Sequence, residues 1–464
     1  MKKTRQHRIK KYIYLLLCTL LICSCEDFLE VDGPLGQIES SEVYEDETTA
    51  TAAVMTLYGK LRDEVLLTGR PEGVGTLMGI YADELDFYGF GGEPMDSFYQ
   101  HQVYSDDLIV ENLWNGSYSL IYMTNATLAG LENSKTLSNA TKAQLRGEAM
   151  FIRSLAYFYL VNLFGDIPYP TGTKYETNRN LPKVPVSKVY EMIITDLKEA
   201  KSLLSTNYLL DERTRANQMV VAALLARVYL YTKQWSLAET EAGTLINNVF
   251  VFRLEPEVSQ EFLKESTSTI LQLRPKYDGG NTLEASTFLF TSGPPPLVAL
   301  NPEFIEGMEE GDNRKNQWIG AVTDGTETWY FPYKYKYNSN TGTSLEFSKI
   351  FRISEQFLIR AEARGKQGNL LGALEDLNVI RNRAGLPDSD ANSDSGIFEA
   401  IIKERFHELF SEFGHRWFDI KRLNLANEIL APIKSGWNPT DILLPIPEAE
   451  LMMNPNLNPQ NSGY

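Results

Sequence analysis

Apolar and small residues recur every three or four positions along several long segments of this 464-residue chain, and this spacing constrains the fold more than any other feature. In residues 141–164 the apolar positions are Ala149, Ile152, Ala156, Leu160 and Leu163. Residues at this spacing lie on one stripe of an α-helix. Because such a stripe is buried only against another element, the sequence predicts a mostly α-helical chain with helices packed side by side.

Two further segments predict pairs of antiparallel helices. One pair combines a helical repeat at residues 222–229 with a second helix over residues 234–247. The other pair covers residues 352–384 and turns at Gly368. Small residues at the helix crossing and a glycine-containing turn resemble tetratricopeptide units. Plain antiparallel helix packing is the alternative explanation of the same pattern.

The regions between these helices have a different texture. Residues 253–348 contain a predicted strand at residues 269–273, followed by loops rich in glycine, proline and tyrosine. A similar loop-like stretch, residues 68–107, lies between two helices that we predict at residues 42–66 and 108–133. The sequence therefore predicts irregular regions set into a helical scaffold.

Charge and cysteine usage exclude several classes of function. The chain has 61 acidic and 44 basic residues and a formal net charge of -17, which argues against nucleic-acid binding because phosphate recognition needs a basic face. Its cysteines are Cys18, Cys23 and Cys25. No disulfide, thiolate nucleophile or cysteine-ligated metal is therefore expected after Cys25.

The first 24 residues are predicted to be a lipoprotein signal peptide. Six basic residues precede an apolar run at residues 12–22, as in secretory signals. This run is shorter than the roughly 20 residues that a permanent membrane span needs. Removing residues 1–24 takes away six basic residues and no acidic ones, which changes the net charge from -17 to -23.

Cys25 is the expected site of lipidation. Ile22 stands three positions before it and Ser24 directly before it, an arrangement that resembles a bacterial lipobox. Cys23 ranks second, because the bulky Ile22 would then occupy the cleavage position. An ordinary cleaved signal with chance cysteines is the third alternative. Several acyl chains on Cys25 would anchor the protein stably to a membrane surface.

Five segments, in order and together spanning essentially the whole chain after the signal, resemble the SusD/RagB family of Bacteroidetes nutrient-binding lipoproteins. The segments are CEDFLEV from Cys25, RGEAMFIRSLAYFYLVNLFGDIPY at residues 146–169, FRISEQFLIRAEARGKQGNLLGALEDLNVIRNRAGLP at residues 351–387, IKERFHELFSEFGHRWFDIKR at residues 402–422, and LLPIPEAELMMNPNLNPQNSGY at residues 443–464.

The resemblance implies a fold and a function. It implies one mostly α domain over residues 25–464, with tetratricopeptide-like hairpins at about 140–250 and 350–425 and irregular ligand-binding parts at about 68–107 and 253–348. It also implies a lipoprotein anchored in the outer membrane through acylated Cys25 and facing the cell exterior. Such a protein binds an oligosaccharide and delivers it to a SusC-like TonB-dependent transporter. Some members bind a peptide instead, and the family has no known catalysis.

The first window of candidate ligand-binding residues lies in residues 81–104. Aromatic faces stack on pyranose rings while carboxylates and amides bind the hydroxyls, and the candidates here are Asp86, Phe87, Tyr88, Phe90 and Tyr99. In the family, the loop before a W-x-x-x-Y pattern, here Trp114 and Tyr118, often faces ligand. The alternative is that these aromatic residues pack onto the helices beneath them. Trp114 itself is expected in the core.

The second window lies in residues 318–337. Aromatic residues of one parity, from Trp329 to Tyr337, predict a strand with a buried aromatic face, so core packing is expected for Tyr333 to Tyr337. Polar neighbours suggest that Trp318 and Trp329 are more exposed. These two residues and Tyr330 complete the ligand-binding candidates.

Charged residues on the helices are expected to form structural ion pairs and not acid–base pairs. They are Glu148, Arg153, Glu362, Arg381, Glu404, Glu408 and Arg416, together with a turn pair of Asp312 and Arg314.

Two common catalytic motifs are incomplete or absent in the sequence. His407-Glu408 has Ser411 where a zinc-protease helix needs its second histidine, and no G-x-S-x-G elbow occurs. We expect no enzyme activity and no metal or other cofactor. A surface glycoside hydrolase stays the less favoured alternative, because 61 acidic residues supply many pairs of carboxylates.

Overall fold

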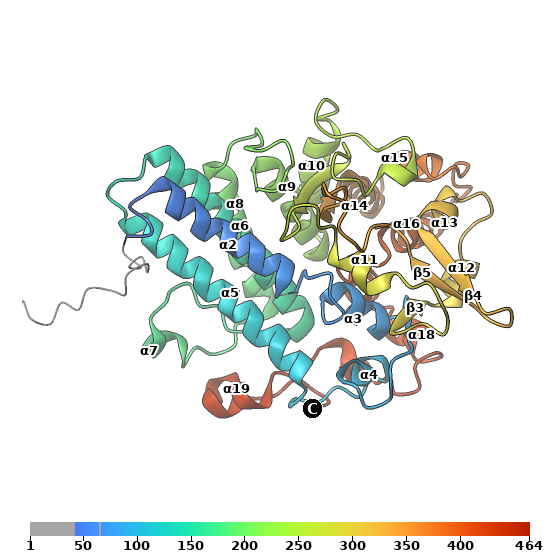
Figure 1. Ribbon diagram of the computed structural model, residues 1–464, viewed down its shortest axis with the longest axis horizontal. Coiled ribbons are helices and arrows are strands. Elements are labelled where there is room, and N and C mark those ends of the chain that lie inside the picture. Colours follow the sequence, from blue (N-terminus) through green and yellow to red (C-terminus); the bar gives the residue numbers. More distant parts are fainter. Residues whose placement is uncertain (1–41, 65) are drawn as a thin grey trace, which may run out of the picture.

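The computed structural model describes residues 42–64 and 66–464 (Figure 1). The predicted signal peptide and Cys25 therefore lie outside the described residues. The described chain is mainly α-helical with a few short strands, which confirms the fold class that the helical spacing predicts. Within these ranges, no helix has both the length and the apolar character needed to cross a membrane.

Long helices build the scaffold. They are α2 (Glu47–Asp63), α5 (Leu108–Asn133), α6 (Asn139–Phe164), α8 (Val186–Leu203), α9 (Gln218–Tyr231), α10 (Trp235–Ile246), α14 (Ile353–Lys366), α15 (Leu370–Arg383) and α16 (Asp394–Leu409). The central one is α6, which packs against α2, α5 and α8, and every residue from Gly147 to Phe164 is buried. The single apolar stripe seen in the sequence therefore underestimates the burial of α6, because other helices cover α6 on several sides.

Local capping sets the ends of these helices. The Asp107 side chain accepts a hydrogen bond from Ile109 N at 2.8 Å and begins α5, while Ser138 Oγ accepts one from Thr141 N at 3.1 Å and begins α6. At the other end of α6, Gly165 has φ +75°, a conformation that glycine adopts without strain. The predicted start at residue 141 missed the Ser138 cap.

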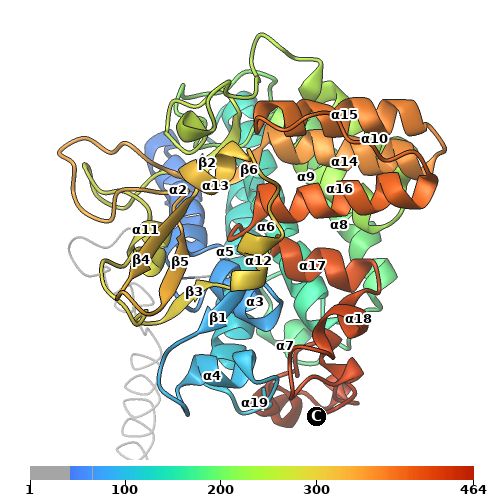
Figure 2. The ribbon, with the colours of Figure 1, turned by 90° about the vertical axis from the view of Figure 1, so that its right-hand side faces the viewer.

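Both predicted helical hairpins are present. The pairs α9–α10 and α14–α15 each form antiparallel neighbours, and α10 also packs against α14, so the two hairpins stack although they are far apart in sequence. Figure 2 shows α10, α14, α15 and α16 lying side by side. The turn of the second hairpin contains Gly368 at φ +81°, and the Asn369 side chain caps α15 by accepting a hydrogen bond from Gly372 N at 3.1 Å.

Two small antiparallel sheets lie beside the scaffold. The four-stranded sheet has the order β1 (Leu85–Phe87), β3 (Val298–Leu300), β5 (Thr328–Pro332) and β4 (Ile319–Thr323), and the other pairs β2 (Thr269–Leu273) with β6 (Ser348–Arg352). The predicted strand at residues 269–273 is confirmed as β2. The stretch 68–107 is more ordered than predicted, because it forms α3 (Val74–Tyr81), β1 and α4 (Pro94–Tyr99).

Short elements connect these parts. They are α7 (Tyr175–Asn178), α11 (Leu283–Phe288), α12 (Pro302–Glu306), α13 (Asn313–Gln317), α17 (His415–Arg422), α18 (Ala426–Leu430), α19 (Glu448–Met453) and the 3-10 turns Val258–Gln260, Pro439–Ile442 and Pro455–Leu457. The C-terminal segment returns to the scaffold, where Asn461 Nδ2 donates to the carbonyls of Phe164 and Leu444 at 2.8 and 2.7 Å.

Candidate functional site

The four-stranded sheet brings the two aromatic windows together. Because β3 pairs with both β1 and β5, segments far apart in sequence become neighbours. Side chains alternate between the faces of a sheet. The face that includes Phe87 and Tyr330 packs against the main hydrophobic core. The opposite face, here called the outer face, carries Asp86, Tyr88, Ala299, Asn301, Trp329 and Phe331.

Aromatic rings form the floor of the outer face. Trp329 clusters with Phe290, Ala299 and Phe331, and the ring centroids of Phe290 and Phe331 are 4.8 Å apart. Gly293 lies directly against the indole, since a Cβ atom at this position would come within 1.9 Å of the Trp329 ring. The outer face is therefore a closely packed surface, and a side chain at residue 293 would disrupt it.

Polar groups lie beside this floor. Asp86 Oδ1 accepts hydrogen bonds from the Tyr99 hydroxyl at 3.3 Å and from Asn301 Nδ2 at 3.2 Å. Tyr88 is 38% exposed. Partial burial and the nearby carboxylates of Asp86 and Glu327 raise the pKa of Tyr88. An exposed aromatic ring with carboxylate and amide groups around it suits a sugar ring and its hydroxyls.

Lys434 supports this arrangement from a distant part of the chain. Its Nζ atom donates to the Ile80 carbonyl at 2.9 Å and lies 3.7 Å from the centroid of the Tyr99 ring. Burial lowers the pKa of Lys434 to about 8. Nothing in the local sequence pattern around position 434 connects this lysine to Tyr99, so the sequence does not predict it.

The expected exposure of Trp318 and Trp329 is wrong. Trp318 is 1% exposed, its Nε1 donates to the Val258 carbonyl at 2.7 Å, and its ring packs edge-on against Phe262. It therefore belongs to the core and leaves the set of ligand-binding candidates. Trp329 is 5% exposed, because residues of the loop that contains Gly293 cover its ring. Polar neighbours in the sequence indicate that the backbone is near the surface, but they do not determine whether the tryptophan ring is buried.

The other candidates occupy different surroundings. Phe87 and Tyr330 are partly buried against the main core, as the packing alternative predicts, whereas Phe90 is 83% exposed. Trp114 is buried, which confirms its expected core position. The predicted aromatic alternation ends early: Tyr337 is exposed, since β5 stops at Pro332.

The predicted structural ion pairs are confirmed. Asp312 and Arg314 form a buried pair at 2.8 Å. The pairs made by the other seven residues are Glu148–Arg215, Arg153–Asp196, Glu362–Arg422, Arg381–Glu309, Glu404–Arg314, Glu408–Arg352 and Arg416–Asp83. These side chains hold elements of the scaffold together.

Among the described residues, no group of three or more histidine, cysteine, aspartate or glutamate side chains is arranged to hold a metal ion. His407 lies in the core beside Phe304, and burial lowers its pKa to about 3. A buried neutral imidazole of this kind is poorly placed to exchange protons with a substrate.

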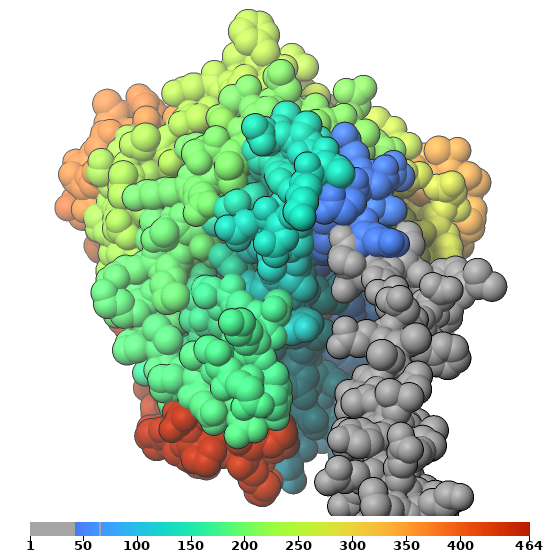
Figure 3. Space-filling model, turned by 90° about the vertical axis from the view of Figure 1, so that its left-hand side faces the viewer, coloured from blue at the N-terminus to red at the C-terminus, as the bar shows by residue number. Residues whose placement is uncertain are grey.

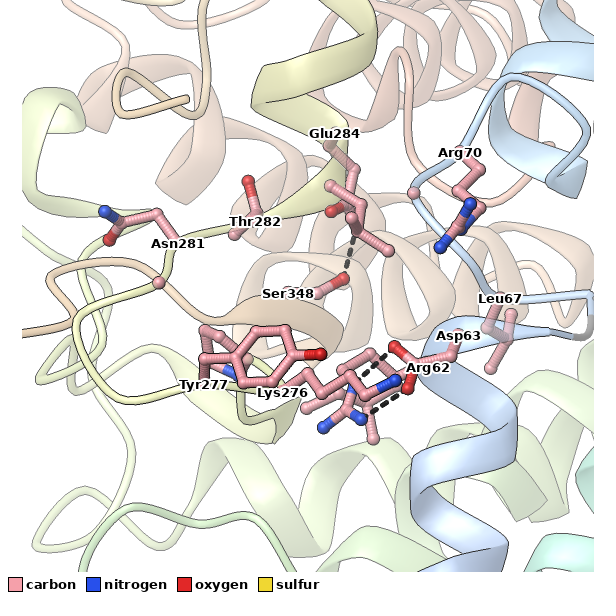
Figure 4. Close-up of a pocket in the computed structure, with 15 residues that line it drawn as sticks. Arg62, Asp63, Leu67, Arg70, Lys276, Tyr277, Asn281, Thr282, Glu284 and Ser348 are labelled. Carbon is pink, nitrogen blue, oxygen red and sulfur yellow. Dashed lines mark hydrogen bonds and ion pairs between the residues drawn. The ribbon is translucent and has the colours of Figure 1, made fainter. Parts of the chain in front are cut away.

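A cavity of about 210 Å³ opens between the end of α2, the end of β2 and the start of α11 (Figure 4). Glu284 lies at its wall. One carboxylate oxygen accepts a hydrogen bond from Ser348 Oγ, and Oε2 has no partner among the described residues. Burial raises the pKa of Glu284. Arg70 and Lys276 also line this cavity, and neither forms an ion pair within the described chain.

Comparisons with known proteins agree with this architecture. A family model described as starch-binding and associating with the outer membrane matches residues 93–230, and a SusD family model matches residues 303–464. This chain belongs to the SusD/RagB family. A SusD-like protein of Formosa agariphila, P2, is 29% identical to it over 98% of this chain and 100% of the relative.

Solved structures of SusD-like proteins share the fold. A SusD superfamily protein from Bacteroides vulgatus has a TM-score of 0.77 at 20% identity and covers 91% of this chain and 100% of its own. A laminarin-binding SusD-like protein has a TM-score of 0.76 at 22% identity, with coverage of 91% and 100%. Surface glycan-binding protein A from Bacteroides fluxus has a TM-score of 0.74 at 21% identity, with coverage of 90% and 100%.

Proposed function

We propose that this SusD-like protein captures an oligosaccharide at the cell surface and delivers it to a SusC-like TonB-dependent transporter of the outer membrane. The observation that carries the proposal is the half-exposed Tyr88 ring of the outer face, which lies near Trp329 and the carboxylates of Asp86 and Glu327. Two structural neighbours named for binding laminarin and a surface glycan support the ligand class.

Binding at the outer face uses stacking and hydrogen bonding together. The apolar face of one sugar ring covers the exposed part of the Tyr88 side chain. Sugar hydroxyls donate to the carboxylates of Asp86 and Glu327, whose charges already act on the Tyr88 hydroxyl. Phe90 stands out from the same loop and offers a second, fully exposed ring.

The proposed membrane anchor is inferred from the sequence, because Cys25 precedes the residues that the structure describes. The lipobox-like residues around Cys25 support acylation of this cysteine, and several acyl chains hold a protein at a membrane where one alone is marginal. The Cys25→Ala variant is expected to leave the outer-membrane fraction and to incorporate no labelled palmitate. Retention of the label in this variant contradicts Cys25 as the lipidation site.

Isothermal titration calorimetry against a panel of glycans tests the ligand class. We expect Tyr88→Ala to weaken binding by roughly tenfold or more, as truncation of a central aromatic contact does. Tyr104→Ala, which removes an exposed tyrosine that lies outside the outer face, is the matched control and should bind normally. Binding of peptides without any glycan contradicts the proposal. Cleavage of a bound glycan that disappears on replacing one carboxylate favours a hydrolase.

A further inference from the structure

A second surface of the molecule combines tyrosine rings with amide groups. A hollow of about 560 Å³ lies between α5, the segment that contains α7, and α19 near the C-terminus. We call it the tyrosine–asparagine hollow; its lining includes Asn115, Tyr118, Tyr122, Tyr175, Asn178, Asn180 and Glu450. In Figure 3 the teal surface of α5 is recessed beside the green segment and the red C-terminal segment. Its volume is typical of small-ligand sites, which range from about 300 to 1,000 Å³.

Hydrogen bonds from the walls hold the hollow open. The Tyr118 hydroxyl donates to the Pro168 carbonyl at 2.8 Å, and Asn125 Nδ2 donates to the Pro170 carbonyl at 2.9 Å. These bonds fix the loop that leads into α7 against α5. On the opposite side, Asn454 Nδ2 donates at 2.8 Å to the carbonyl of Leu181, which follows α7. The walls are therefore positioned before any ligand arrives, which reduces the entropy cost of binding.

Other groups in the hollow make no hydrogen bond within the described chain. The hydroxyls of Tyr122 and Tyr175 and the side-chain groups of Asn180 and Glu450 have no partner there. Tyr122 is 53% exposed and Tyr175 is 69% exposed. Arg179 lies 5.6 Å from the Tyr175 ring and forms part of the rim. Two exposed aromatic rings thus stand among unused donors and acceptors.

We infer that the tyrosine–asparagine hollow is a second glycan-binding site, separate from the outer face, that takes a neutral oligosaccharide segment. Sugar rings stack on Tyr122 and Tyr175, and hydroxyls bind Asn180 and Glu450. A neutral ligand fits better than an acidic one, because the charged lining residues are one cation, Arg179, and one carboxylate, Glu450, and so offer no net positive charge. Partial burial and the nearby charge of Glu111 raise the pKa of Glu450. This inference rests on the proposed glycan-binding function.

The test measures stoichiometry as well as affinity. Neutral hexasaccharides from α-glucan, β-glucan, mannan and xylan are titrated calorimetrically into the protein and into the variants Tyr88→Ala, Tyr122→Ala and Tyr104→Ala. All three tyrosines are exposed or half-exposed, so folding is expected to be retained, and thermal unfolding checks it. For a bound hexasaccharide we expect two sites per protein. Tyr122→Ala should weaken one of them by roughly tenfold and leave the site that depends on Tyr88 unchanged.

The outcomes separate this inference from the proposed function. One site that is lost in Tyr88→Ala and unchanged in Tyr122→Ala overturns the second site and leaves the outer face as the binding surface. One site with the opposite response supports the hollow and contradicts the outer face. Failure of every hexasaccharide to bind contradicts both. If Tyr122→Ala instead loses co-purification with the transporter and keeps its glycan stoichiometry, the hollow is a protein contact and the inference is overturned.

Discussion

Two buried glutamates in this protein have opposite surroundings. Glu408 accepts hydrogen bonds from Arg314 Nη1 at 3.1 Å, from Arg352 Nη1 at 3.0 Å and from Arg383 Nη2 at 2.5 Å. These guanidinium groups hold its pKa well below the usual range although burial alone would raise it. Glu284 receives one side-chain hydrogen bond, from a serine, and burial raises its pKa.

The two glutamates differ in what surrounds them. The charge of Glu408 ties together α13, α15, α16 and β6, so its surroundings serve the fold. Glu284 instead borders a cavity, and the nearby cations Arg70 and Lys276 form no ion pair with it among the described residues (Figure 4). In this family member the matched charge of Glu408 therefore lies within the scaffold, whereas the unmatched carboxylate of Glu284 lies at the wall of a cavity.

Removing Arg352 should have the largest effect on stability. Arg352 donates to Glu261 at 2.7 Å and to Glu412 at 2.9 Å as well as to Glu408. Arg352→Ala would leave these carboxylates without a central cation, and breaking a buried pair on one side costs about 3–5 kcal/mol. Urea denaturation followed by circular dichroism measures the change in the free energy of unfolding.

Arg274→Ala is the matched control for this experiment. Arg274 pairs with Asp278 at 2.7 Å, and both side chains are exposed. Exposed pairs contribute about 0–1 kcal/mol, so this variant should unfold almost as the wild type does. If Arg352→Ala costs no more than Arg274→Ala, the comparison between matched and unmatched charges fails.

Neutralising Glu408 should give a smaller, pH-dependent loss. Its folded-state pKa lies below the unfolded value of about 4.5, so its stabilisation is present above pH 4.5 and is lost as the pH falls through the folded value. Glu408→Gln should therefore be less stable than wild type by about 2–3 kcal/mol at pH 7, and the gap should narrow in acid. Denaturation curves at pH 7, 5 and 3 measure this, and a gap that widens in acid contradicts it.

The scaffold could be predicted because its signals are local. The bounds of α5 match the prediction because Asp107 caps its start, and the apolar period runs unbroken to its end. The strand predicted at residues 269–273 matches β2, all five residues of which are buried in the structure. The sequence also predicts that Glu408 forms an ion pair. It does not identify the partners, because their positions depend on how four elements meet.

The candidate site could be predicted only in part, because its shape depends on distant contacts. Asp86 and Tyr88 meet Trp329 through β3, a three-residue strand that no sequence pattern indicated. Trp318 was misplaced because burial of a ring is decided by what covers it. The tyrosine–asparagine hollow was missed altogether, although Tyr118 and Tyr122 stand one turn apart on the predicted helix, because its other walls come from the C-terminal segment and the loop around α7.

The same substitution at Glu284 should have the smallest effect and the opposite sign. Its folded pKa is raised, so protonation stabilises the fold below the unfolded value of about 4.5, and this contribution is lost as the pH rises through the folded value. Glu284→Gln keeps the acceptor for Ser348 and removes the unpaired charge. It should be more stable than wild type by up to about 1 kcal/mol at pH 7, with the gain disappearing near pH 4. Parallel denaturation series of Glu284→Gln and Glu408→Gln provide the measurement. Two pH slopes of the same sign would contradict the contrast between the two carboxylates, because only a matched charge can lose stability where an unmatched one gains it.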